Sequence, residues 1–149
     1  MSQNLPPIKK SFVSSDASVA IITHQGKYLL QCRDSIDGIF YPGYWSLFGG
    51  AAEKDESPSQ TVHREVREEL NTLINPVYFS ELKFNKNFWS ENLELVTRTY
   101  FACDLSSSDV KNLVLNEGYD YAFVEYSQMD RLLICPYDRF MIDYHAACR

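Results

Sequence analysis

The chain has 149 residues, of which 45% are hydrophobic, so it is long enough to bury one ordinary core and too short for two comfortable domains. Its formal net charge of −6 disfavours binding to nucleic-acid phosphates, and no polybasic patch marks a membrane surface as a partner. We therefore expect a single domain over residues 16–149 behind a flexible lead-in of residues 1–15, with no nucleic-acid or membrane partner.

The first predicted elements are two apolar strands that form a hairpin. Residues 17–23 and 28–32 are apolar runs joined across Gln25-Gly26, a pair typical of tight hairpin turns. The stretch 34–44 then interrupts regular structure with two glycines and a proline. Its aromatic residues make it a candidate for ligand contact rather than a plain linker.

A short strand over residues 45–48 and a Gly-Gly turn lead to a helix whose start is well marked. If Ser57 caps this helix, Pro58 takes the first helical position and Gln60 the third. This is the capping-box pattern, with a proline where its missing N–H costs nothing. Asn71 is expected to end the helix, because asparagine tolerates the left-handed backbone conformation better than any residue except glycine.

The second half of the chain continues to mix strands with helices. Asn75-Pro76 interrupts the chain before strand patterns at residues 77–84 and 95–104. The remaining expected elements, in chain order, are a turn over 106–109, a strand over 121–125, a weak helix around 127–132 and a terminal helix over 136–147. This mixture suits a central sheet with helices on its faces, an α/β fold.

The cysteines do not indicate a zinc site. They show no Cys-x-x-Cys spacing and no alignment with histidines, and they stand at Cys32, Cys103, Cys135 and Cys148. The first ten residues lack the apolar core of an export signal, and no apolar run approaches the length of a membrane span. We therefore expect reduced, partly buried thiols and a cytoplasmic protein.

Three carboxylates share one face of the helix that begins at Ser57. With Glu65 set at zero and about 100° per residue, Glu69 lies near +40° and Glu68 near −60°. The adjoining stripe can pack against a sheet and consists of Val62, Val66 and Leu70. Taken alone, Glu-x-x-Glu-Glu is more typical of a solvated acidic helix face. Like charges at this spacing repel, however, and a hard cation with oxygen ligands, Mg²⁺ or Mn²⁺, would neutralise them.

The wider pattern around these glutamates resembles the signature of the Nudix hydrolase family, the MutT-like nucleoside diphosphate hydrolases. That signature reads G-x5-E-x7-R-E-U-x-E-E-x-G-U, where U is a bulky aliphatic residue. Its matching positions in this chain are Gly50, Glu56, Arg64, Glu65, Val66, Glu68 and Glu69. Two positions depart from it, Asn71 for the last glycine and Thr72 for the last aliphatic residue. Neither position carries charge, so the departures concern the end of the helix rather than the chemistry.

The resemblance implies a fold, a reaction and a cofactor. The family's fold is an α/β/α sandwich with a mixed central β-sheet. Similar proteins hydrolyse nucleoside diphosphates linked to another group, by attack of water at phosphorus. Mg²⁺, or Mn²⁺ in its place, neutralises the charge of the diphosphate in such proteins.

The resemblance also implies roles for individual residues. Glu65 and Glu69 would be the principal metal ligands, and Glu68 would be a further ligand, directly or through water. The carbonyl of Gly49 would complete the metal's coordination sphere.

The signature further implies an ion pair between Arg64 and Glu56. This pair would pin the loop between Gly50 and Ser57, called the signature loop below, onto the helix, because a planar guanidinium suits a bidentate carboxylate. Without the wider pattern, an ordinary surface ion pair would be the simpler interpretation.

The catalytic base is either a glutamate of the signature, Glu65 or Glu68, or a residue from a later loop. Glu117 is the candidate from a loop, because it stands in the turn-like stretch Asn116-Glu-Gly-Tyr119 just before a strand. Its alternative interpretation is a solvated turn residue. Asp120 is the fallback.

Substrate contacts are indicated only by residue type. Arg33, at the end of the second strand, and Arg98, on a later strand, have the charge to reach phosphates. An aromatic ring has the shape to stack on a base, and the candidates are Tyr44, Tyr41, Phe88 and Trp89. Such aromatic residues belong to protein packing more often than to ligand sites.

Two functional interpretations follow. The first is a Mg²⁺-dependent diphosphohydrolase acting on a nucleoside triphosphate, an oxidised one included, or on a nucleotide sugar, because the signature handles only metal and diphosphate. The second is a non-catalytic Nudix-like sensor or regulatory module that binds a nucleotide. Such a module would be expected to lose signature carboxylates, whereas all are present here. Many similar proteins are dimers, and a homodimer is expected on that ground alone.

Overall fold

The computed structural model of the protein describes residues 15–35, 41–85, 91–118 and 120–149. The predicted lead-in, except for Ser15, lies outside the described residues, and so do the stacking candidates Phe88 and Trp89. No helix among the described residues is long and apolar enough to cross a bilayer.

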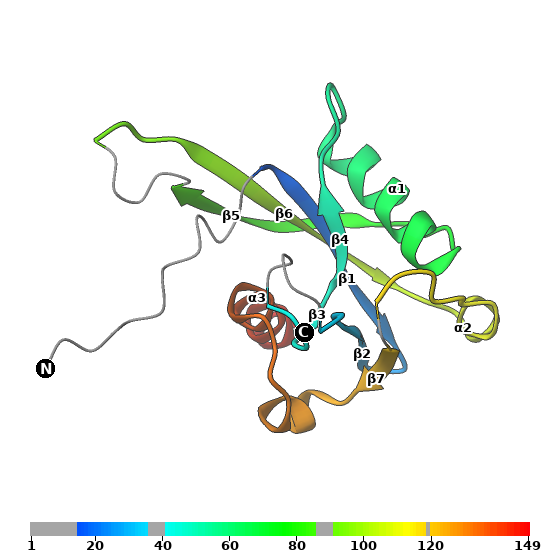
Figure 1. Ribbon diagram of the computed structural model, residues 1–149. Coiled ribbons are helices and arrows are strands. Elements are labelled where there is room, and N and C mark those ends of the chain that lie inside the picture. Colours follow the sequence, from blue (N-terminus) through cyan, green and yellow to red (C-terminus); the bar gives the residue numbers. More distant parts are fainter. Residues whose placement is uncertain (1–14, 36–40, 86–90, 119) are drawn as a thin grey trace, which may run out of the picture.

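Strands and helices follow the expected mixture along the chain (Figure 1). In chain order the elements are β1 (Ala17–His24), β2 (Lys27–Cys32), β3 (Trp45–Ser46), β4 (Phe48–Ala51), α1 (Pro58–Leu70), β5 (Val77–Asn85), β6 (Leu95–Asp104), α2 (Ser107–Lys111), β7 (Asp120–Val124), the 3₁₀ helix η1 (Tyr126–Arg131) and α3 (Pro136–Ala147). The weak helix expected around residues 127–132 is thus a 3₁₀ helix.

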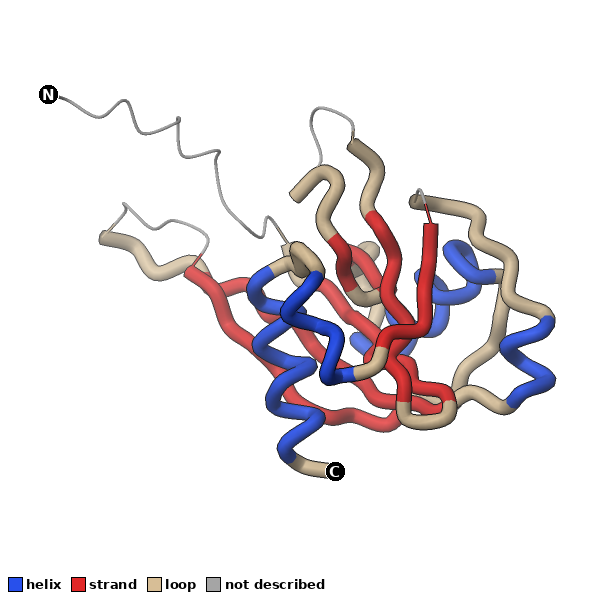
Figure 2. The backbone as a smooth tube through the Cα atoms, turned by 90° about the horizontal axis from the view of Figure 1, so that it is seen from below, coloured by secondary structure: helices blue, strands red, loops and turns tan. Residues whose placement is uncertain are grey.

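A mixed sheet forms the centre of the molecule, with helices on both of its faces (Figure 2). Its strands lie in the order β3-β2-β1-β6-β5, while β4 also pairs with β1 and β7 with β2. β1 runs parallel to β6 and antiparallel to β2 and β4. β2 pairs with the end of β1, at Thr23, whereas β4 pairs with its beginning, from Ala17 to Ala20. β2 and β4 therefore diverge from one another along β1, their common partner. Residues from both sides of this divergence line the site described below.

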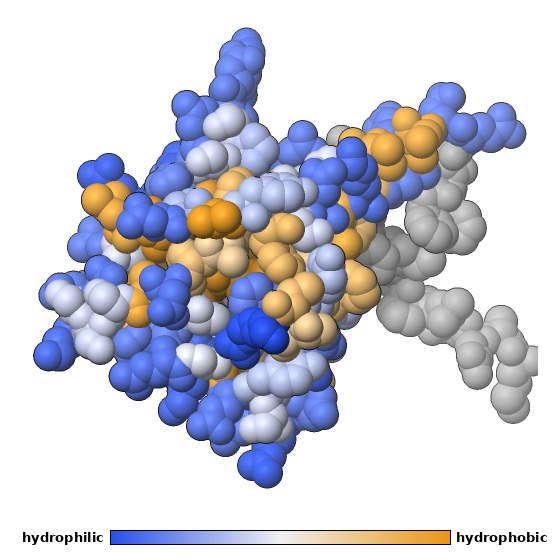
Figure 3. Space-filling model, turned by 180° about the vertical axis from the view of Figure 1, so that it is seen from behind, coloured by the Kyte–Doolittle hydropathy of each residue, from blue (hydrophilic) through white to orange (hydrophobic). Residues whose placement is uncertain are grey.

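On the face that Figure 3 shows, the surface is largely hydrophilic, and apolar side chains gather in patches between the hydrophilic ones. Large apolar side chains that stay exposed include Val77 and Tyr78 on β5 and Leu95 on β6. β5 ends the sheet order, so one side of its backbone has no neighbouring strand in that order. Such an edge is where a second chain can add to a sheet.

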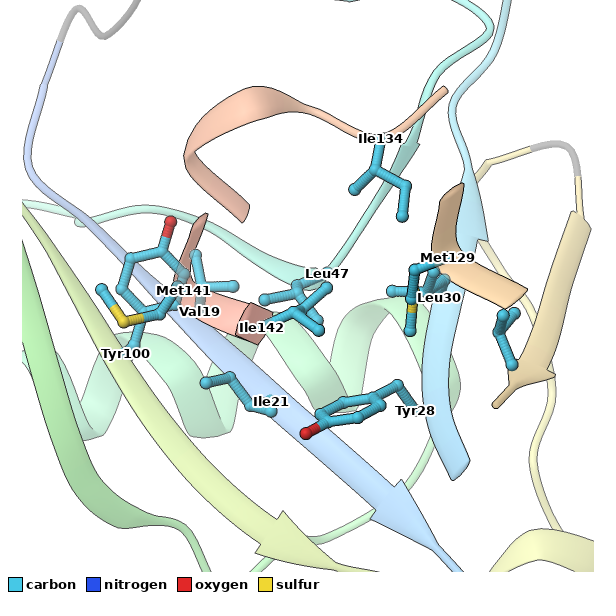
Figure 4. Close-up of a cluster of buried hydrophobic side chains, with 11 residues drawn as sticks. Val19, Ile21, Tyr28, Leu30, Leu47, Tyr100, Met129, Ile134, Met141 and Ile142 are labelled. Atoms are coloured by element: carbon cyan, nitrogen blue, oxygen red, sulfur yellow. The ribbon is translucent and has the colours of Figure 1, made fainter. Parts of the chain in front are cut away.

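Alternation along β1 divides the core into two layers. Val19 and Ile21 belong to the cluster that includes Ile142 of α3, part of which is drawn in Figure 4. Ala20 and Ile22, which point to the other face of the strand, pack in the cluster that contains the apolar stripe of α1. The two layers make the protein an α/β/α sandwich, which confirms the predicted fold class.

The predicted turn and caps have the expected local geometry. Gln25 and Gly26 both have positive φ angles, 49° and 75°, as a two-residue hairpin turn with matching twist requires. Ser57 and Gln60 form the capping box at the start of α1. Asn71 ends α1 in the left-handed conformation, with φ 51° and ψ 38°.

Two local predictions were wrong. The strand expected over residues 45–48 is divided into β3 and β4, and Gly49-Gly50 is not a turn but part of β4, paired with β1. The turn expected at residues 106–109 is the capped start of α2, where the Ser106 hydroxyl accepts from the Asp109 N–H and the Asp109 carboxylate accepts from the Ser106 N–H. Turns and helix caps favour the same residue types, which explains the second error.

Candidate active site

Two carboxylates of α1 lie against the glycines of β4. The Gly49 N–H donates to Oε2 of Glu69 over 3.0 Å. At Gly50 a Cβ atom would lie only 2.6 Å from Cδ of Glu65. The absence of a side chain at Gly50 leaves room for the Glu65 carboxylate, and the Gly49 N–H holds Glu69, so both carboxylates lie at the same short segment of β4.

These carboxylates line a cavity of about 370 Å³, within the size range of small-molecule sites. α1 contributes Glu65 and Glu69, the loop before β7 contributes Glu117, and β4 contributes its glycines. The rest of the lining comes mainly from β2, from the junction of β3 and β4, from β6 and from the start of α3. The acidic part of the cavity is thus formed by α1 and by the loop before β7, next to the glycines of β4.

The structure brings together only some of the residues predicted for the site. Those that line the cavity are Gly49, Glu65, Glu69, Glu117, Arg33 and Arg98. Glu68 and Asp120 are absent from its lining, and the Tyr44 ring packs against the ring of Tyr41 instead. Glu68 lies on a separate outer groove with its side chain half-exposed.

Arg64 organises the signature loop, as the expected ion pair requires. Its Nε donates to Oε2 of Glu56 over 2.8 Å, and its Nη2 donates to Oε1 of the same carboxylate over 3.0 Å. The Nη2 also donates to the carbonyl of Ala51 over 2.9 Å, and the Nη1 donates to Oε1 of Glu65 over 2.8 Å. Arg64 therefore joins the loop, the end of β4 and one carboxylate of the cavity.

The Glu56 carboxylate is held in its charged form by these contacts. Hydrogen bonds from Arg64 and then from Thr61 lower the pKa of Glu56 to about 2. The Thr61 hydroxyl donates to Oε1 over 2.7 Å, a contact that the signature does not indicate. Since the folded-state pKa lies below the ordinary value, this contribution to stability is present above the ordinary pKa and is lost as the pH falls toward 2.

The carboxylates of the cavity are shifted in the opposite direction. Burial first, and then the charges of Glu65 and Glu117, raise the pKa of Glu69 to about 8, although the Gly49 N–H opposes the shift. Burial also raises the pKa of Glu65. Two adjacent acids that resist ionisation would be stabilised as anions by a positive ion between them.

This donor set fits a hard divalent cation. Its atoms are the carboxylate oxygens of the glutamates, with the backbone of Gly49 and Gly50 nearby, and oxygen ligands are those that a hard cation prefers. No three acidic, histidine or cysteine side chains within the described ranges form a complete metal site by themselves. Mg²⁺ does not require one, because it keeps several waters and commonly uses one or two carboxylates together with substrate phosphates.

The end of the cavity away from these glutamates is built around a buried ion pair that the sequence did not indicate. Asp138, in the first turn of α3, is fully buried and accepts from Nη2 of Arg98 over 3.0 Å. The same carboxylate accepts from the Tyr100 hydroxyl over 2.9 Å and from the Leu47 N–H over 3.0 Å. The Arg98 guanidinium lies 4.6 Å from the centre of the Tyr137 ring.

Arg98 is therefore anchored rather than freely available to reach phosphates. Its Nε also donates to the Tyr100 hydroxyl over 2.9 Å. Burial works against the charged guanidinium, but the adjacent Asp138 carboxylate outweighs it, so the pKa of Arg98 is raised. For Asp138, the partner of Arg98, the only signal in the sequence was its place in the first turn of a predicted helix.

Comparison with known proteins places the chain in a family. The Nudix domain family model matches residues 14–142. The nucleoside triphosphatase NudI of Escherichia coli O139:H28 is 33% identical over 110 residues, which are 70% of this chain and 77% of that protein. The chain belongs to the Nudix hydrolase family, and it is a Nudix-type pyrophosphohydrolase.

Solved structures share its fold at lower sequence identity. The MutT protein from Methanosarcina mazei Go1 has a TM-score of 0.69 at 21% identity, covering 89% of this chain and 94% of its own. The dihydroneopterin triphosphate pyrophosphohydrolase of E. coli has a TM-score of 0.66 at 18% identity, covering 86% and 92%. These similarities extend over most of the sandwich.

Proposed function

We propose that the protein is a Mg²⁺-dependent pyrophosphohydrolase of nucleoside triphosphates. The observation that carries this proposal is the pair of carboxylates, the buried Glu69 and the partly buried Glu65, that meet in the cavity against the glycines of β4. The NudI relative, which is named as a nucleoside triphosphatase, supports the choice of substrate class. Mn²⁺ has the same preference for oxygen ligands and is expected to replace Mg²⁺.

Each residue of the acidic part has a role in this proposal. Glu65 and Glu69 would hold the cation together with the Gly49 carbonyl. When bound, the cation would neutralise phosphate oxygens and favour ionisation of a water molecule. Glu117 lines the same cavity and its charge acts on both glutamates, so we assign it the role of general base.

Arg64 and Glu68 act from outside the cavity. Arg64 donates to Oε1 of Glu65, which fixes the orientation of that carboxylate. Glu68 accepts from the same Nη1 over 3.2 Å, so its place in the proposal is to hold Arg64. Arg33 lines the cavity and supplies a positive charge for a phosphate.

The test is the release of phosphate or pyrophosphate from a panel of nucleotides. The panel contains nucleoside triphosphates, their oxidised forms, nucleotide sugars and dinucleoside compounds, each assayed after metal removal with EDTA and again after addition of Mg²⁺ or Mn²⁺. We expect turnover of triphosphates that requires the metal and yields a nucleoside monophosphate and pyrophosphate. Turnover confined to nucleotide sugars would overturn the substrate class.

The same experiment separates the enzyme from a nucleotide sensor. A sensor would bind a triphosphate, as a rise in melting temperature reports, but would hydrolyse no member of the panel. The complete set of signature carboxylates favours the enzyme.

We also propose that the enzyme is a cytoplasmic homodimer. All four cysteines are free thiols, as suits a reducing compartment. The exposed Val77 and Tyr78 on the edge strand β5 and the exposed Phe140 on α3 give apolar surface for a second copy. Light scattering on the purified protein measures the assembly directly, and a monomer at micromolar concentration would refute the dimer.

Changing Gly50 to alanine is expected to lower turnover by roughly 10 to 100-fold with little change in stability. The new Cβ would meet only the far end of the flexible Glu65 side chain, with Cδ at 2.6 Å and both carboxylate oxygens at 2.7 Å. The carboxylate must therefore move, whereas the backbone can stay. Kinetics at several Mg²⁺ concentrations, with a melting curve, measure both effects. Unchanged kinetics would show that the position of the Glu65 carboxylate does not matter.

A further inference from the structure

The loop before β7, residues 112–118, passes the end of α1, to which Asn116 fastens it (Figure 1). The Asn116 N–H donates to the carbonyl of Glu69 over 2.8 Å, and its side-chain Nδ2 donates to the carbonyl of Glu68 over 3.0 Å. Two residues earlier, the Val114 N–H donates to the carbonyl of Leu70 over 3.2 Å. The last carbonyls of a helix have no partner within that helix, so the loop supplies donors that the end of α1 lacks.

Gln31 of β2 supports the same loop from the sheet. The residue is 6% exposed and lines the cavity, and its Nε2 donates to the carbonyl of Leu47 over 3.2 Å. Its Oε1 would lie only 3.0 Å from a Cβ atom at Gly118, so the loop lies directly against this amide. Burial raises the pKa of Glu69, and a hydrogen bond from the Gln31 side chain is one of the contacts that oppose this rise. Gln31 therefore contacts both the loop and a carboxylate of the cavity.

These contacts hold the two neighbours of Glu117. Asn116 precedes it and is bonded to α1, while Gly118 follows it and lies against β2. The Glu117 carboxylate lines the cavity but accepts no hydrogen bond from the described residues. The backbone of the loop alone therefore sets the place of this carboxylate.

We propose that Asn116 and Gln31 are positioning residues, which fix Glu117 at a set distance from the Glu69 carboxylate by holding the loop between α1 and β2. The inference rests on the proposed function, because it takes Glu69 as a metal ligand and Glu117 as the general base. A displacement of about 1 Å at a reacting group can cost roughly 100-fold in rate. The loop contacts therefore matter for the chemical step, whereas binding of the cation and the phosphates depends on other residues.

The kinetic test places Asn116→Ala and Glu117→Gln in a double-mutant cycle. Asn116→Ala is expected to lower kcat by roughly tenfold and to change KM by less than about twofold. In the Glu117→Gln background the same change should lower kcat by less than about twofold, since no base remains to be misplaced. Asn112→Ala is the matched control, because the Asn112 side chain also donates to a helix carbonyl, that of Ser108 in α2, but lies outside the cavity. It should leave kcat unchanged.

Hydrogen exchange of backbone amides tests the loop contacts without turnover. In the metal-free protein, Asn116→Ala should make the amide of Val114 exchange roughly five- to tenfold faster, because a hydrogen bond that holds the loop on α1 is lost. Gln31→Leu keeps the approximate volume but removes the amide, and it should have the same effect at the amide of Asn116. Asn116 is exposed, so its variant should fold even if the Gln31 variant does not. Gln128→Leu, which changes an exposed glutamine on η1, is the control and should alter neither rate.

The two measurements separate this inference from the proposed function. Faster exchange in the loop, together with a loss of kcat that disappears in the Glu117→Gln background, supports the positioning role. Unchanged exchange in both variants would overturn it even if triphosphates are hydrolysed. Losses of kcat that multiply in the double variant would also overturn it, because Asn116 would then not act through Glu117. If the wild type hydrolyses no nucleotide, the proposed function fails, and the exchange rates alone decide whether Asn116 and Gln31 hold the loop.

Discussion

Replacing Glu69 with glutamine is expected to lower turnover by roughly 10³-fold, equivalent to about 4 kcal/mol of transition-state stabilisation. Glutamine keeps the size of the side chain and an oxygen that can accept from the Gly49 N–H, so the local packing is preserved. What is lost is the negative charge at the centre of the proposed metal site. Kinetics at saturating Mg²⁺ with the preferred triphosphate measure this effect.

The same substitution is expected to stabilise the metal-free protein. The pKa of Glu69 is raised to about 8 because the carboxylate is buried beside Glu65, whereas an ordinary glutamate titrates near 4.5. A folded-state pKa above the unfolded value means that the unfolded chain releases the proton first. Wild-type stability therefore falls as the pH rises above about 4.5 and levels off near pH 8. Glutamine does not ionise, so Glu69→Gln does not lose stability in this way as the pH rises.

The raised pKa of Glu69 predicts a pH-dependent difference in stability between the wild type and Glu69→Gln. In EDTA at pH 8, Glu69→Gln should be more stable by roughly 2 to 4 kcal/mol, with a melting temperature higher by about 5 to 10 °C. At pH 5 the difference should nearly vanish, because Glu69 is then protonated in the wild type as well. Glu81→Gln, which removes an exposed carboxylate on β5 in contact with Lys83, serves as the control and should change neither property. Equal melting temperatures at pH 8 would show that Glu69 is ionised in the folded protein without cost.

The position of two glutamates of the acidic part, Glu65 and Glu69, was predictable because one helix carries both. The separation between Glu65 and Glu69 places them on one face of any helix, and the Ser57 cap and the Asn71 end are marked by residues within a few positions of the helix. Local rules therefore sufficed there. They were insufficient for Glu68, which shares that face by angle but is drawn to Arg64 on the outer side of α1.

The other end of the site could not be predicted from local patterns, because distant segments build it. Arg98 was expected to reach phosphates, but its carboxylate partner stands 40 residues further along the chain. The junction of β3 and β4 lies within a stretch that sequence patterns merged into one strand. The parallel pairing of β1 with β6 joins residues about 80 positions apart, and only the family resemblance indicated such a topology. Long-range pairing of this kind leaves no periodic signal in the sequence.

The largest loss of stability is expected from changing Gly49 to alanine. Gly49 has a φ of +147°, a conformation that residues with a side chain rarely adopt. A Cβ there would lie 2.2 Å from the carbonyl oxygen of Ser18 and 2.6 Å from the Cα of Val19. Both are backbone atoms of β1, the strand at the centre of both core layers, so the clash cannot be relieved by moving a side chain. β4 would have to leave β1.

We expect Gly49→Ala to destabilise the protein by about 3 kcal/mol or more, seen as a fall of roughly 10 °C in melting temperature or as insoluble protein. Gly26→Ala is the matched control, because Gly26 also has a positive φ, +75°, but nothing lies within 4 Å of the added Cβ. It should cost only about 1 kcal/mol, the conformational part of the penalty. Gly50→Ala is a second comparison, because that change is expected to leave the fold intact and to reduce turnover instead. If Gly49→Ala and Gly26→Ala melt at the same temperature, β4 is not held against β1 as closely as the structure shows. β4 would then not be the element that fixes the positions of the two glutamates.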